Sequence, residues 1–279
     1  MNRRNVVGAL VGDIAGSVYE FNNYRSKDFE LFAPWHGRKC FATDDSIMTL
    51  AICEALMRSR ESGYDNLSRQ AVECMQQIGR PYPDCGYGGR FLKWMYEDDP
   101  LPYNSYGNGS AMRVSPCAWV DPSVGRALAK TSAEVTHNHP EGIKGAMATA
   151  DAIFICREFG GELSPSELKQ RVREHIETEY GYDLSKTLDE IRPTYRFNET
   201  CQDTVPQAIA AFLESTDFED AIRNGISLGG DSDTLAAITG SIAEAAYGIP
   251  EWIRDKAKSF LDAPLKDVLE RWESFLRGE

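Results

Sequence analysis

Apolar residues recur every three or four positions along most of this chain, which is the spacing of helices that bury one face. Strand-like alternation is nearly absent. One helical series runs from Ile47 to Leu56, and another runs from Leu235 to Ala246. Further helices are expected at about 66–77, 124–135, 141–158, 165–177, 204–213, 218–228 and 253–276. The pattern therefore predicts an all-α protein.

Two prolines mark expected helix boundaries. Ser164 followed by Pro165 is typical of a helix start, because serine caps the first turn and proline fits the first helical position. Pro264 falls inside the last helical series and is expected to break it.

Three stretches lack helical spacing and are predicted to be loops. Residues 79–89 and 98–110 are rich in Gly, Pro, Asn and Asp, and residues 180–200 are polar with weak periodicity. The chain has no low-complexity linker that would mark a domain boundary. We therefore expect residues 1–279 to form a single domain whose long loops line a site.

The first apolar segment carries glycine at every fourth position, at Gly8, Gly12 and Gly16. Each glycine inside a helix costs roughly 0.5–1 kcal/mol relative to alanine, so three on one face indicate close packing against another helix. Asp13 lies on the same helix, and Glu20 is expected at its end. A carboxylate on a buried helix must be paired, hydrogen-bonded or bound to a metal.

Two separate segments place a threonine and two aspartates where a helix begins. The first is Thr43, Asp44 and Asp45, and the second is Asp231, Asp233 and Thr234. Either segment alone would be interpreted as an N-cap, because Asp and Thr are favoured there and acidic residues interact well with the helix dipole. A cap needs only one carboxylate, however, and each segment supplies two.

If the two segments converge, four carboxylates share one place. Like charges about 4 Å apart cost several kcal/mol at an effective dielectric near 20, and only protonation or bound cations relieve that cost. Ligand sets made of oxygen alone select hard ions, which are Mg²⁺, Mn²⁺ or Ca²⁺. Two divalent ions would balance four carboxylates. From the residues alone, this convergence is a hypothesis.

Composition narrows the classes of partner. The net charge of −13 makes a nucleic-acid partner unlikely and argues against anionic lipid. The seven cysteines contain no CxxC spacing, which argues against a zinc knuckle and favours a reducing, cytoplasmic location. The apolar run near the start is interrupted by Asp13, so we expect part of the fold and not a signal peptide. No apolar run approaches the ~18–20 residues that span a membrane.

Five motifs occur in one order along the chain. They are GALVGDIAGSVYEF, FATDDSIMTLA, SYGNGSAMRVSP, THNHPEGIKGA and GGDSDTLAAITGSIAEAAYG, and they extend from about residue 8 to about residue 248. Together they resemble the ADP-ribosylglycohydrolase family. The resemblance implies an all-α orthogonal helical bundle with a site for two divalent cations, Mg²⁺ or Mn²⁺. It also implies cleavage of the N- or O-glycosidic bond that joins ADP-ribose to a modified side chain.

The resemblance assigns roles residue by residue. The metal ligands it implies are Thr43, Asp44 and Asp45 on one wall and Asp231, Asp233 and Thr234 on the other. Glu20, or one of the aspartates Asp44 and Asp233, is expected to act as general acid or base. The residues expected to hold the pyrophosphate and the adjoining ribose are Ser105, Tyr106, Gly107, Asn108 and Gly109.

Four further side chains in or near these motifs have expected roles. His137 is expected near the distal phosphate or ribose, whereas His139 is expected at the surface or as a cap. Tyr106 either stacks on adenine or is simply exposed. Arg113 is expected to pair with a buried carboxylate, without a catalytic role.

Two rival functions stay open at this point. One is a two-metal hydrolase that acts on a nucleotide-like phosphoester, although phosphoryl transfer usually recruits Arg or Lys clamps. The other is a non-catalytic ADP-ribose-binding member of the fold, which would be expected to have lost metal carboxylates. The expected partner is an ADP-ribosylated protein or an ADP-ribosyl small molecule. The acceptor linkage, the choice between Mg²⁺ and Mn²⁺, the physiological target and the oligomeric state are not predicted.

Overall fold

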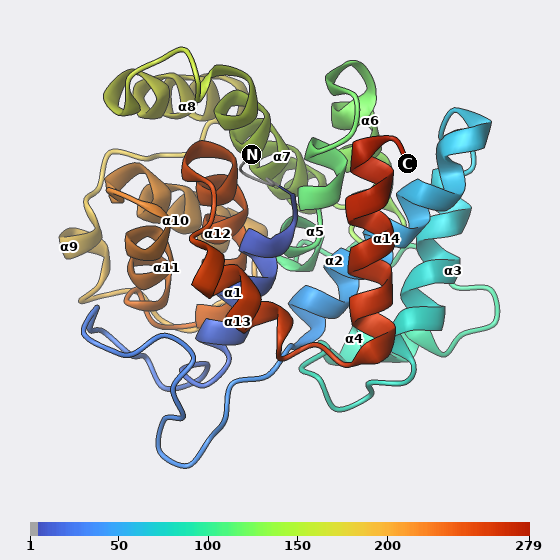
Figure 1. Ribbon diagram of the computed structural model, residues 1–279, viewed down its shortest axis with the longest axis horizontal. Helices are drawn as coiled ribbons and strands as arrows, with labels where there is room; N and C mark the ends of the chain where they lie inside the picture. Colours follow the sequence, from blue (N-terminus) through green and yellow to red (C-terminus); the bar gives the residue numbers. More distant parts are fainter. Residues whose placement is uncertain (1–4) are drawn as a thin grey trace.

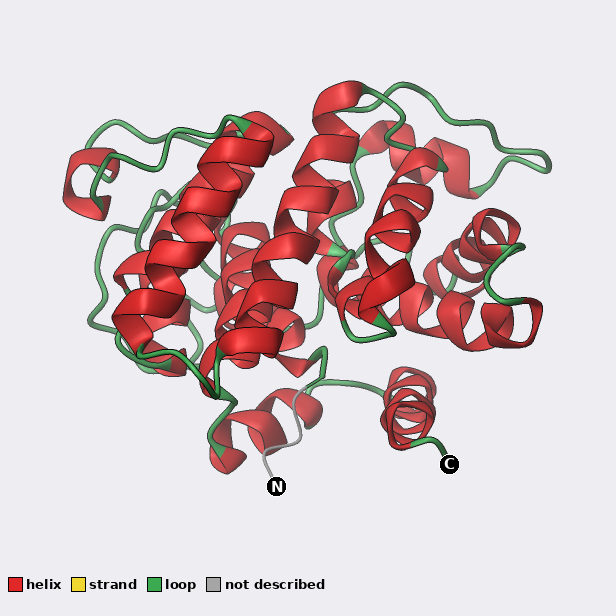
Figure 2. Ribbon diagram, turned by 90° about the horizontal axis from the view of Figure 1, so that it is seen from above, coloured by secondary structure: helices red, strands yellow, loops and turns green. Residues whose placement is uncertain are grey.

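The computed structural model describes residues 5–279, and over that range the fold is entirely helical (Figures 1 and 2). It has fourteen α-helices and two short 3₁₀ helices, and the described residues contain two isolated β-bridges but no strand. The predicted all-α class is confirmed.

The helices follow one another in this order: α1 (Val7–Gly16), α2 (Asp44–Ser59), η1 (Arg60–Ser62), α3 (Leu67–Gly79), α4 (Gly89–Met95), α5 (Gly109–Met112), η2 (Ser115–Ala118), α6 (Pro122–Glu134), α7 (Pro140–Phe159), α8 (Pro165–Tyr180), α9 (Leu188–Ile191), α10 (Cys201–Glu214), α11 (Phe218–Ile226), α12 (Ser232–Tyr247), α13 (Glu251–Lys258) and α14 (Ala263–Arg277).

Helices α1 and α12 form the centre of the fold, and all ten residues of α1 are buried (Figure 1). A Cβ atom added to Gly12 would lie 2.0 Å from the Ala236 carbonyl oxygen, and one added to Gly8 would lie 2.2 Å from the Gly240 carbonyl oxygen. Gly16 abuts Asp233 in the same way. The glycine stripe thus packs backbone against backbone, as predicted. The two helices run antiparallel, so the end of α1 meets the start of α12.

At the opposite end of this pair, a side chain from α12 caps the start of α1. The buried Glu244 carboxylate accepts hydrogen bonds from the Asn5 N–H (2.8 Å) and the Gly8 N–H (2.7 Å). Burial nevertheless raises the pKa of Glu244 to about 7, from an ordinary value of 4.5. The folded state therefore binds this proton more tightly than the unfolded chain does.

This difference predicts a pH-dependent loss of stability. The contribution of Glu244 to the free energy of unfolding is largest below pH 4.5 and falls as pH rises to about 7. The shift corresponds to a loss on the order of 3 kcal/mol. In urea titrations, Glu244→Gln should lack this loss, so that its stability relative to wild type improves between pH 5 and pH 8. Parallel curves for the two proteins, like those expected for the exposed control Glu158→Gln, would contradict the assignment.

Most predicted boundaries agree with the structure, and the exceptions are short elements. The last helical series divides into α13 and α14, with Pro264 in the first turn of α14. Ser164 caps α8 in a capping box with Glu167. Helices α4 and α9 were not predicted: α4 follows the predicted loop 79–89, and α9 lies within the predicted loop 180–200. They have seven and four residues, which are too few to show a helical period. Glu20 is not at the end of α1, which stops at Gly16, but in the turns that follow.

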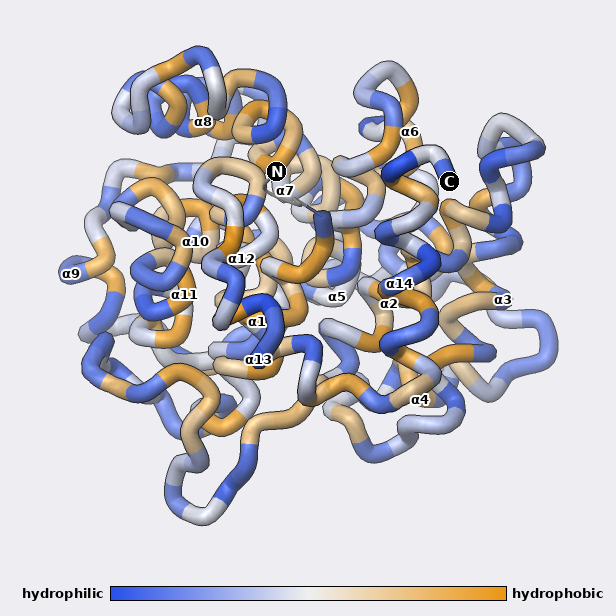
Figure 3. The backbone as a smooth tube through the Cα atoms, in the orientation of Figure 1, coloured by the Kyte–Doolittle hydropathy of each residue, from blue (hydrophilic) through white to orange (hydrophobic). Residues whose placement is uncertain are grey.

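Apolar and polar segments alternate along the outer helices α8 and α14, as expected for helices with one buried face (Figure 3). Their buried apolar residues join one hydrophobic core cluster with those of α1, α2 and α12. None of the described helices is both long enough and apolar enough to cross a lipid bilayer.

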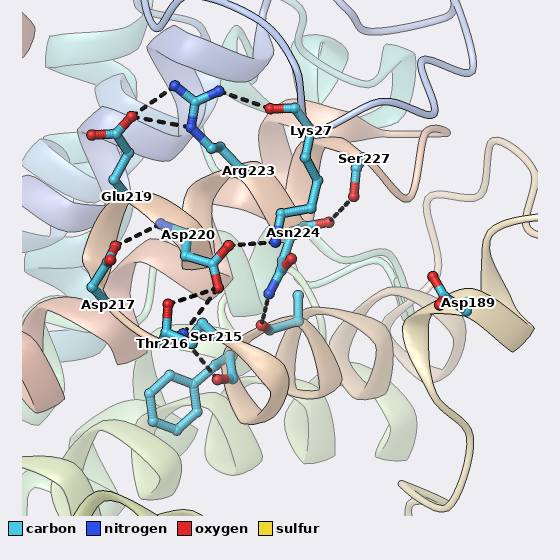
Figure 4. Close-up of polar contacts among 12 residues, drawn as sticks. Lys27, Asp189, Ser215, Thr216, Asp217, Glu219, Asp220, Arg223, Asn224 and Ser227 are labelled. Carbon is cyan, nitrogen blue, oxygen red and sulfur yellow. Dashed lines mark hydrogen bonds and ion pairs between the residues drawn. The ribbon is translucent and has the colours of Figure 1, made fainter.

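The long loop between α1 and α2 carries Glu20, and α11 holds it in place (Figure 4). Arg223 donates to the backbone carbonyls of Lys27 (2.8 Å) and Phe29 (2.5 Å), and Lys27 pairs with Asp220. The loop therefore has a defined position relative to the start of α12.

Candidate metal centre and substrate cavity

The two acidic turns converge at the end of α1. Helix α2 begins at Asp44 and helix α12 begins at Ser232, so each acidic pair lies in or beside a first turn. The Thr234 hydroxyl donates to the Asp45 carboxylate at 3.1 Å, which joins the two turns directly. The convergence predicted from the sequence is thus present in the structure.

Helix capping does not account for the carboxylates. Thr43 is the N-cap of α2, and its hydroxyl accepts from the Asp45 N–H (3.4 Å) while it donates to Asp13 (2.6 Å). Asp231 occupies the N-cap position of α12 but accepts no capping hydrogen bond. The Oδ1 atom of Asp45 is buried with no hydrogen-bond partner. A buried, unpaired carboxylate oxygen is a position that a cation would satisfy.

Five carboxylates form two groups of oxygen ligands. Asp13, Asp45 and Asp233 form one group, and Glu20, Asp231 and Asp233 form the other. Within each group, one oxygen atom from every residue lies within 4.8 Å of the others. Asp233 belongs to both groups, and neither contains His or Cys. The set fits two hard divalent cations that share one carboxylate.

Burial and mutual repulsion favour the protonated forms of these acids. Burial, followed by the charge of Asp233, raises the pKa of Asp45 well above its usual range. Burial also raises the pKa of Asp13 to about 6 and that of Asp231 to about 7. Burial and then the Asp233 charge raise the pKa of Glu20 to about 8. Bound cations would remove this penalty by compensating the negative charges.

Asp13 also joins α1 to α2. Its carboxylate accepts from the Thr43 N–H (3.0 Å), the Thr43 hydroxyl (2.6 Å), the Ser46 N–H (3.0 Å) and the Ser46 hydroxyl. The sequence marks Asp13 as a buried acid in need of a partner, but it was not among the predicted ligands. The available signal was its position on the glycine-rich helix.

Asp44 belongs to neither ligand group but lies beside them. Its N–H donates to the Cys85 carbonyl at 2.7 Å. Its carboxylate faces Gly86, where an added Cβ would lie 3.0 Å from Asp44 Oδ1. Burial, followed by the Asp233 charge, raises the pKa of Asp44 well above its ordinary value. Asp44 therefore forms part of the wall beside the ligand groups.

A cavity of about 280 Å³ opens above the acidic groups. The predicted site residues that line it are Glu20, Asp44, Asp45, Ser105, Gly107, Asn108, Gly109, His137, Asp231, Asp233 and Thr234. Thr43 and Tyr106 do not line it. The lining residues that the sequence did not indicate include Arg90, Phe91, Tyr103 and Glu199. They lie in a short helix or irregular loops, where no spacing marks a function.

Asn108 connects the glycine-rich loop to the acidic centre. Its side-chain amide donates to Asp231 Oδ2 at 2.6 Å and to the Thr204 hydroxyl at 3.2 Å. Its backbone N–H donates to the Glu199 carbonyl at 2.7 Å. The Gly107 N–H donates to Ser105 Oγ at 3.1 Å. Two backbone donors of the loop are thus engaged within the protein, and Asn108 positions a ligand carboxylate.

A buried relay sets the proton of His137. Arg113 donates to the Thr136 hydroxyl at 2.7 Å, so that hydroxyl directs its own proton to His137 Nδ1, 2.6 Å away. Burial, followed by the charges of Arg113 and Arg90, lowers the pKa of His137 well below its ordinary value. The neutral ring therefore carries its proton on Nε2, the atom that faces Gly107 and Gly109.

Arg113 and His139 have structural roles of different kinds. The prediction that Arg113 pairs with a buried carboxylate was wrong. The Arg113 guanidinium donates instead to the Thr136 hydroxyl and the Ser132 carbonyl. His139 caps α7 by accepting from the Glu141 N–H at 3.1 Å, as expected. Tyr106 packs against His139 and is 47% exposed at the surface.

A larger hollow of about 720 Å³ lies at the start of α11, but its charged groups are already engaged (Figure 4). Asp217 caps the helix, Glu219 pairs with Arg223, and Asp220 pairs with Lys27. Among residues 5–279, this hollow contains no group of three carboxylates close enough to bind a cation. The cavity above Asp233 is therefore the stronger candidate.

The acidic centre predicts that divalent cations stabilise the protein. An ion that binds only the folded state adds about 2.7 kcal/mol at 100 times its Kd. For a chain of this size, that corresponds to a rise in Tm of about 5–10 °C. Melting curves in EDTA and in millimolar Mg²⁺ or Mn²⁺ would measure it. Asp217→Asn should keep the rise, because Asp217 is a remote N-cap. An identical Tm with and without cations would contradict the metal centre.

Comparison with known proteins agrees with this geometry. The family model described as ADP-ribosylglycohydrolase matches residues 3–276. The chain is 27% identical to ADP-ribosylhydrolase ARH3 of Mus musculus, over 91% of this chain and 86% of that protein. It is 25% identical to ADP-ribosylarginine hydrolase Tri1 of Pseudomonas putida, over 91% of this chain and 73% of that protein.

A solved structure supports the fold. The structure titled ADP-ribosylglycohydrolase-related protein complex has a TM-score of 0.66 and 23% identity, and the match covers 98% of both chains. With the family model spanning nearly every residue, the assignment follows directly. This chain belongs to the ADP-ribosylglycohydrolase family.

Proposed function

We propose that this protein hydrolyses the glycosidic bond between ADP-ribose and a modified side chain or small acceptor, and so reverses ADP-ribosylation. The observation that carries the proposal is the pair of oxygen-ligand groups sharing Asp233 at the base of one cavity, next to the glycine-rich loop. The relatives named as ADP-ribosylhydrolases support the same reaction.

The cofactor in this proposal is a pair of divalent cations, Mg²⁺ or Mn²⁺. Asp13, Asp45, Asp231, Asp233 and Glu20 would hold them, because these residues supply the oxygen groups. Bound cations of this kind orient substrate hydroxyls and lower the pKa of a coordinated water toward neutrality. Thr43, Asp44 and Thr234 would support the ligands, since Thr234 donates to Asp45 and Thr43 orients Asp13.

Glu20 is placed to move the proton of the reaction. It is partly exposed, lines the cavity and lies in a loop that α11 anchors. Its carboxylate would take a proton from the attacking water or deliver one to the departing acceptor, a contribution of roughly 10²–10⁴-fold. Glycosidic cleavage passes through an oxocarbenium-like state, which the surrounding carboxylates would stabilise electrostatically.

The opposite wall of the cavity would hold the ADP-ribose. Ser105, Gly107 and Gly109 leave room for the ligand there, because the first has a small side chain and the glycines have none, and His137 offers an Nε2–H donor. Arg90 lines the same cavity and is exposed, so it supplies a cation for the pyrophosphate. Because Gly107 and Asn108 use their backbone donors internally, Arg90 and His137 become the main candidates for phosphate contacts.

We also propose that residues 1–279 act as one domain in the cytoplasm. The single core cluster supports the first point. The second is supported by six free thiols, which are Cys40, Cys53, Cys74, Cys85, Cys117 and Cys201.

The test is release of ADP-ribose from a panel of defined linkages. The panel contains ADP-ribosyl-arginine peptides, ADP-ribosyl-serine peptides and small O-linked ADP-ribosyl acceptors, each assayed with EDTA, Mg²⁺ or Mn²⁺. The proposal predicts cation-dependent release of ADP-ribose from at least one linkage. Free nucleotides and simple phosphoesters serve as the comparison, and their selective hydrolysis would favour a phosphoesterase. Binding of ADP-ribose without turnover of any substrate would favour a binding protein.

A further inference from the structure

A second groove lies beside the catalytic cavity and is rich in arginine. It has a volume of about 570 Å³ and is lined by Asn23, Arg25, Arg192, Pro193 and Arg196. We call these five residues the arginine groove. Its lining residues come from the two segments 23–25 and 192–196. Glu20 and Glu199, each three positions along the chain from one of these segments, line the catalytic cavity. Each of the two segments that line the arginine groove therefore continues, within a few residues, into the lining of the catalytic cavity.

The groove is built onto the turn that carries a predicted metal ligand. Arg25 donates to the carbonyl oxygens of Leu228 and Tyr195, and so links the two segments to this turn. The Gly230 N–H donates to Asn23 Oδ1 at 3.3 Å, immediately before Asp231. These contacts hold the groove at a defined position relative to the acidic centre.

The positive charge of the groove is poorly compensated. Across residues 5–279, neither Arg25 nor Arg196 forms an ion pair. Arg196 is exposed and donates only to the backbone carbonyls of Pro193 (3.2 Å) and Tyr195 (2.8 Å). Burial, followed by the Arg196 charge, lowers the pKa of Arg25. Arg192 pairs with Asp189 of α9, whose side chain is 91% exposed. An anion would relieve the repulsion between these arginines.

An exposed aromatic pair adjoins the groove. The rings of Phe21 and Phe197 lie 4.9 Å apart, and their residues are 63% and 36% exposed. Phe21 directly follows Glu20, and Phe197 directly follows Arg196. A bound ligand that extends from the catalytic cavity to the groove would therefore cross the apolar surface of these two rings.

We propose that the arginine groove binds an anionic side chain of the protein acceptor, on a peptide segment that crosses the Phe21–Phe197 pair. This inference rests on the proposed function and adds a recognition subsite to it. Glu20 and Arg25 are five residues apart, and an extended chain spans at most about 3.3–3.6 Å per residue. An anionic residue about five positions from the modified one can therefore reach the groove.

The remaining charge of the protein favours a peptide over a nucleic acid. The net charge is −13, so a long polyanion would be repelled outside the groove. One carboxylate or phosphate, in contrast, matches the planar donors of one or two guanidinium groups. The adjoining phenylalanines also suit the apolar parts of a peptide.

The experiment compares kcat/KM for matched ADP-ribosylated peptides with the linkage that the enzyme cleaves. One peptide is neutral, and the others carry a single glutamate, phosphoserine or lysine at successive positions within five residues on either side. Wild-type enzyme should prefer the best acidic peptide by up to about 5-fold, the upper range for one solvent-exposed ion pair. Arg196→Gln should lower this ratio to about 1–2, and Arg196→Glu should invert it in favour of a lysine peptide. Arg69→Gln removes another exposed charge, on α3, and should retain the wild-type ratio.

Each other outcome has a distinct meaning. Equal kcat/KM for acidic and neutral peptides, or a ratio that Arg196→Gln leaves unchanged, would overturn the subsite. An Arg196-dependent preference for an ADP-ribosylated oligonucleotide over every peptide would replace the peptide with a nucleic-acid partner. If ADP-ribose is released from small acceptors and peptides alike, but the peptides show no acidic preference, only the subsite fails. If no substrate releases ADP-ribose, the proposed function itself fails.

Discussion

Asp233→Asn is expected to lower kcat/KM for ADP-ribose release by about 10³-fold or more. Asp233 is the one carboxylate that belongs to both ligand groups, so the substitution removes charge from both cation positions. Loss of an outer-shell partner already costs about 10–100-fold in metal affinity or activity, and a shared ligand should cost more. The variant should also lose most of the cation-dependent rise in Tm.

The fold itself should tolerate this change. Asparagine has nearly the same volume as aspartate, and the amide oxygen can still accept from the Thr234 N–H, which Asp233 Oδ1 contacts at 3.0 Å. Without cations, the variant should be as stable as wild type or more stable, because one buried charge is gone. Asp217→Asn is the matched control at another helix start. Activity within about tenfold of wild type would show that Asp233 is not a shared ligand.

Glu20→Gln is expected to lower kcat by about 10²–10⁴-fold, the usual contribution of a positioned acid or base. Glutamine keeps the size of the side chain but cannot exchange a proton at neutral pH. Glu20 belongs to one of the two ligand groups, so the cation-dependent rise in Tm should be reduced only in part. Single-turnover rates at saturating cation and substrate would separate the chemical step from binding.

The matched control is Glu30→Gln, an exposed residue in the same loop. It should retain wild-type kcat. If Glu20→Gln keeps full turnover on an ADP-ribosylated peptide, Glu20 is excluded as the general base. Its place would then pass to an aspartate of the cavity, and Asp44 is the candidate because it lies outside both ligand groups.

Much of the fold could be predicted from local patterns. The apolar spacing gave the long helices, and the glycines at positions 8, 12 and 16 indicated a close helix pair. The identity of the partner helix could not be predicted, because it depends on packing between residues more than 200 positions apart. Helices α4 and α9 were missed because they are shorter than the window in which a helical period is visible.

Part of the acidic centre could also be predicted from local patterns. Two carboxylates at each helix start exceed what capping needs, which indicated a cation site. The residues alone could not show which partner each side chain at the start of α2 has. In the structure, Thr43 contacts Asp13, whereas Asp45 faces Asp233. Arg90, in the short helix α4, and Glu199, in an irregular loop, gave no signal, because an isolated charge is usually only solvated.

The central claim is that the starts of α2 and α12 hold a pair of cations through Asp233. The most direct measurement is anomalous scattering at the manganese edge from crystals grown with Mn²⁺. The account predicts two peaks about 3.5–4 Å apart, the usual spacing of a two-metal site, with Asp233 oxygens beside both. A map with no peak at this position, with Asp45 and Asp233 bonded only to protein groups, would contradict it.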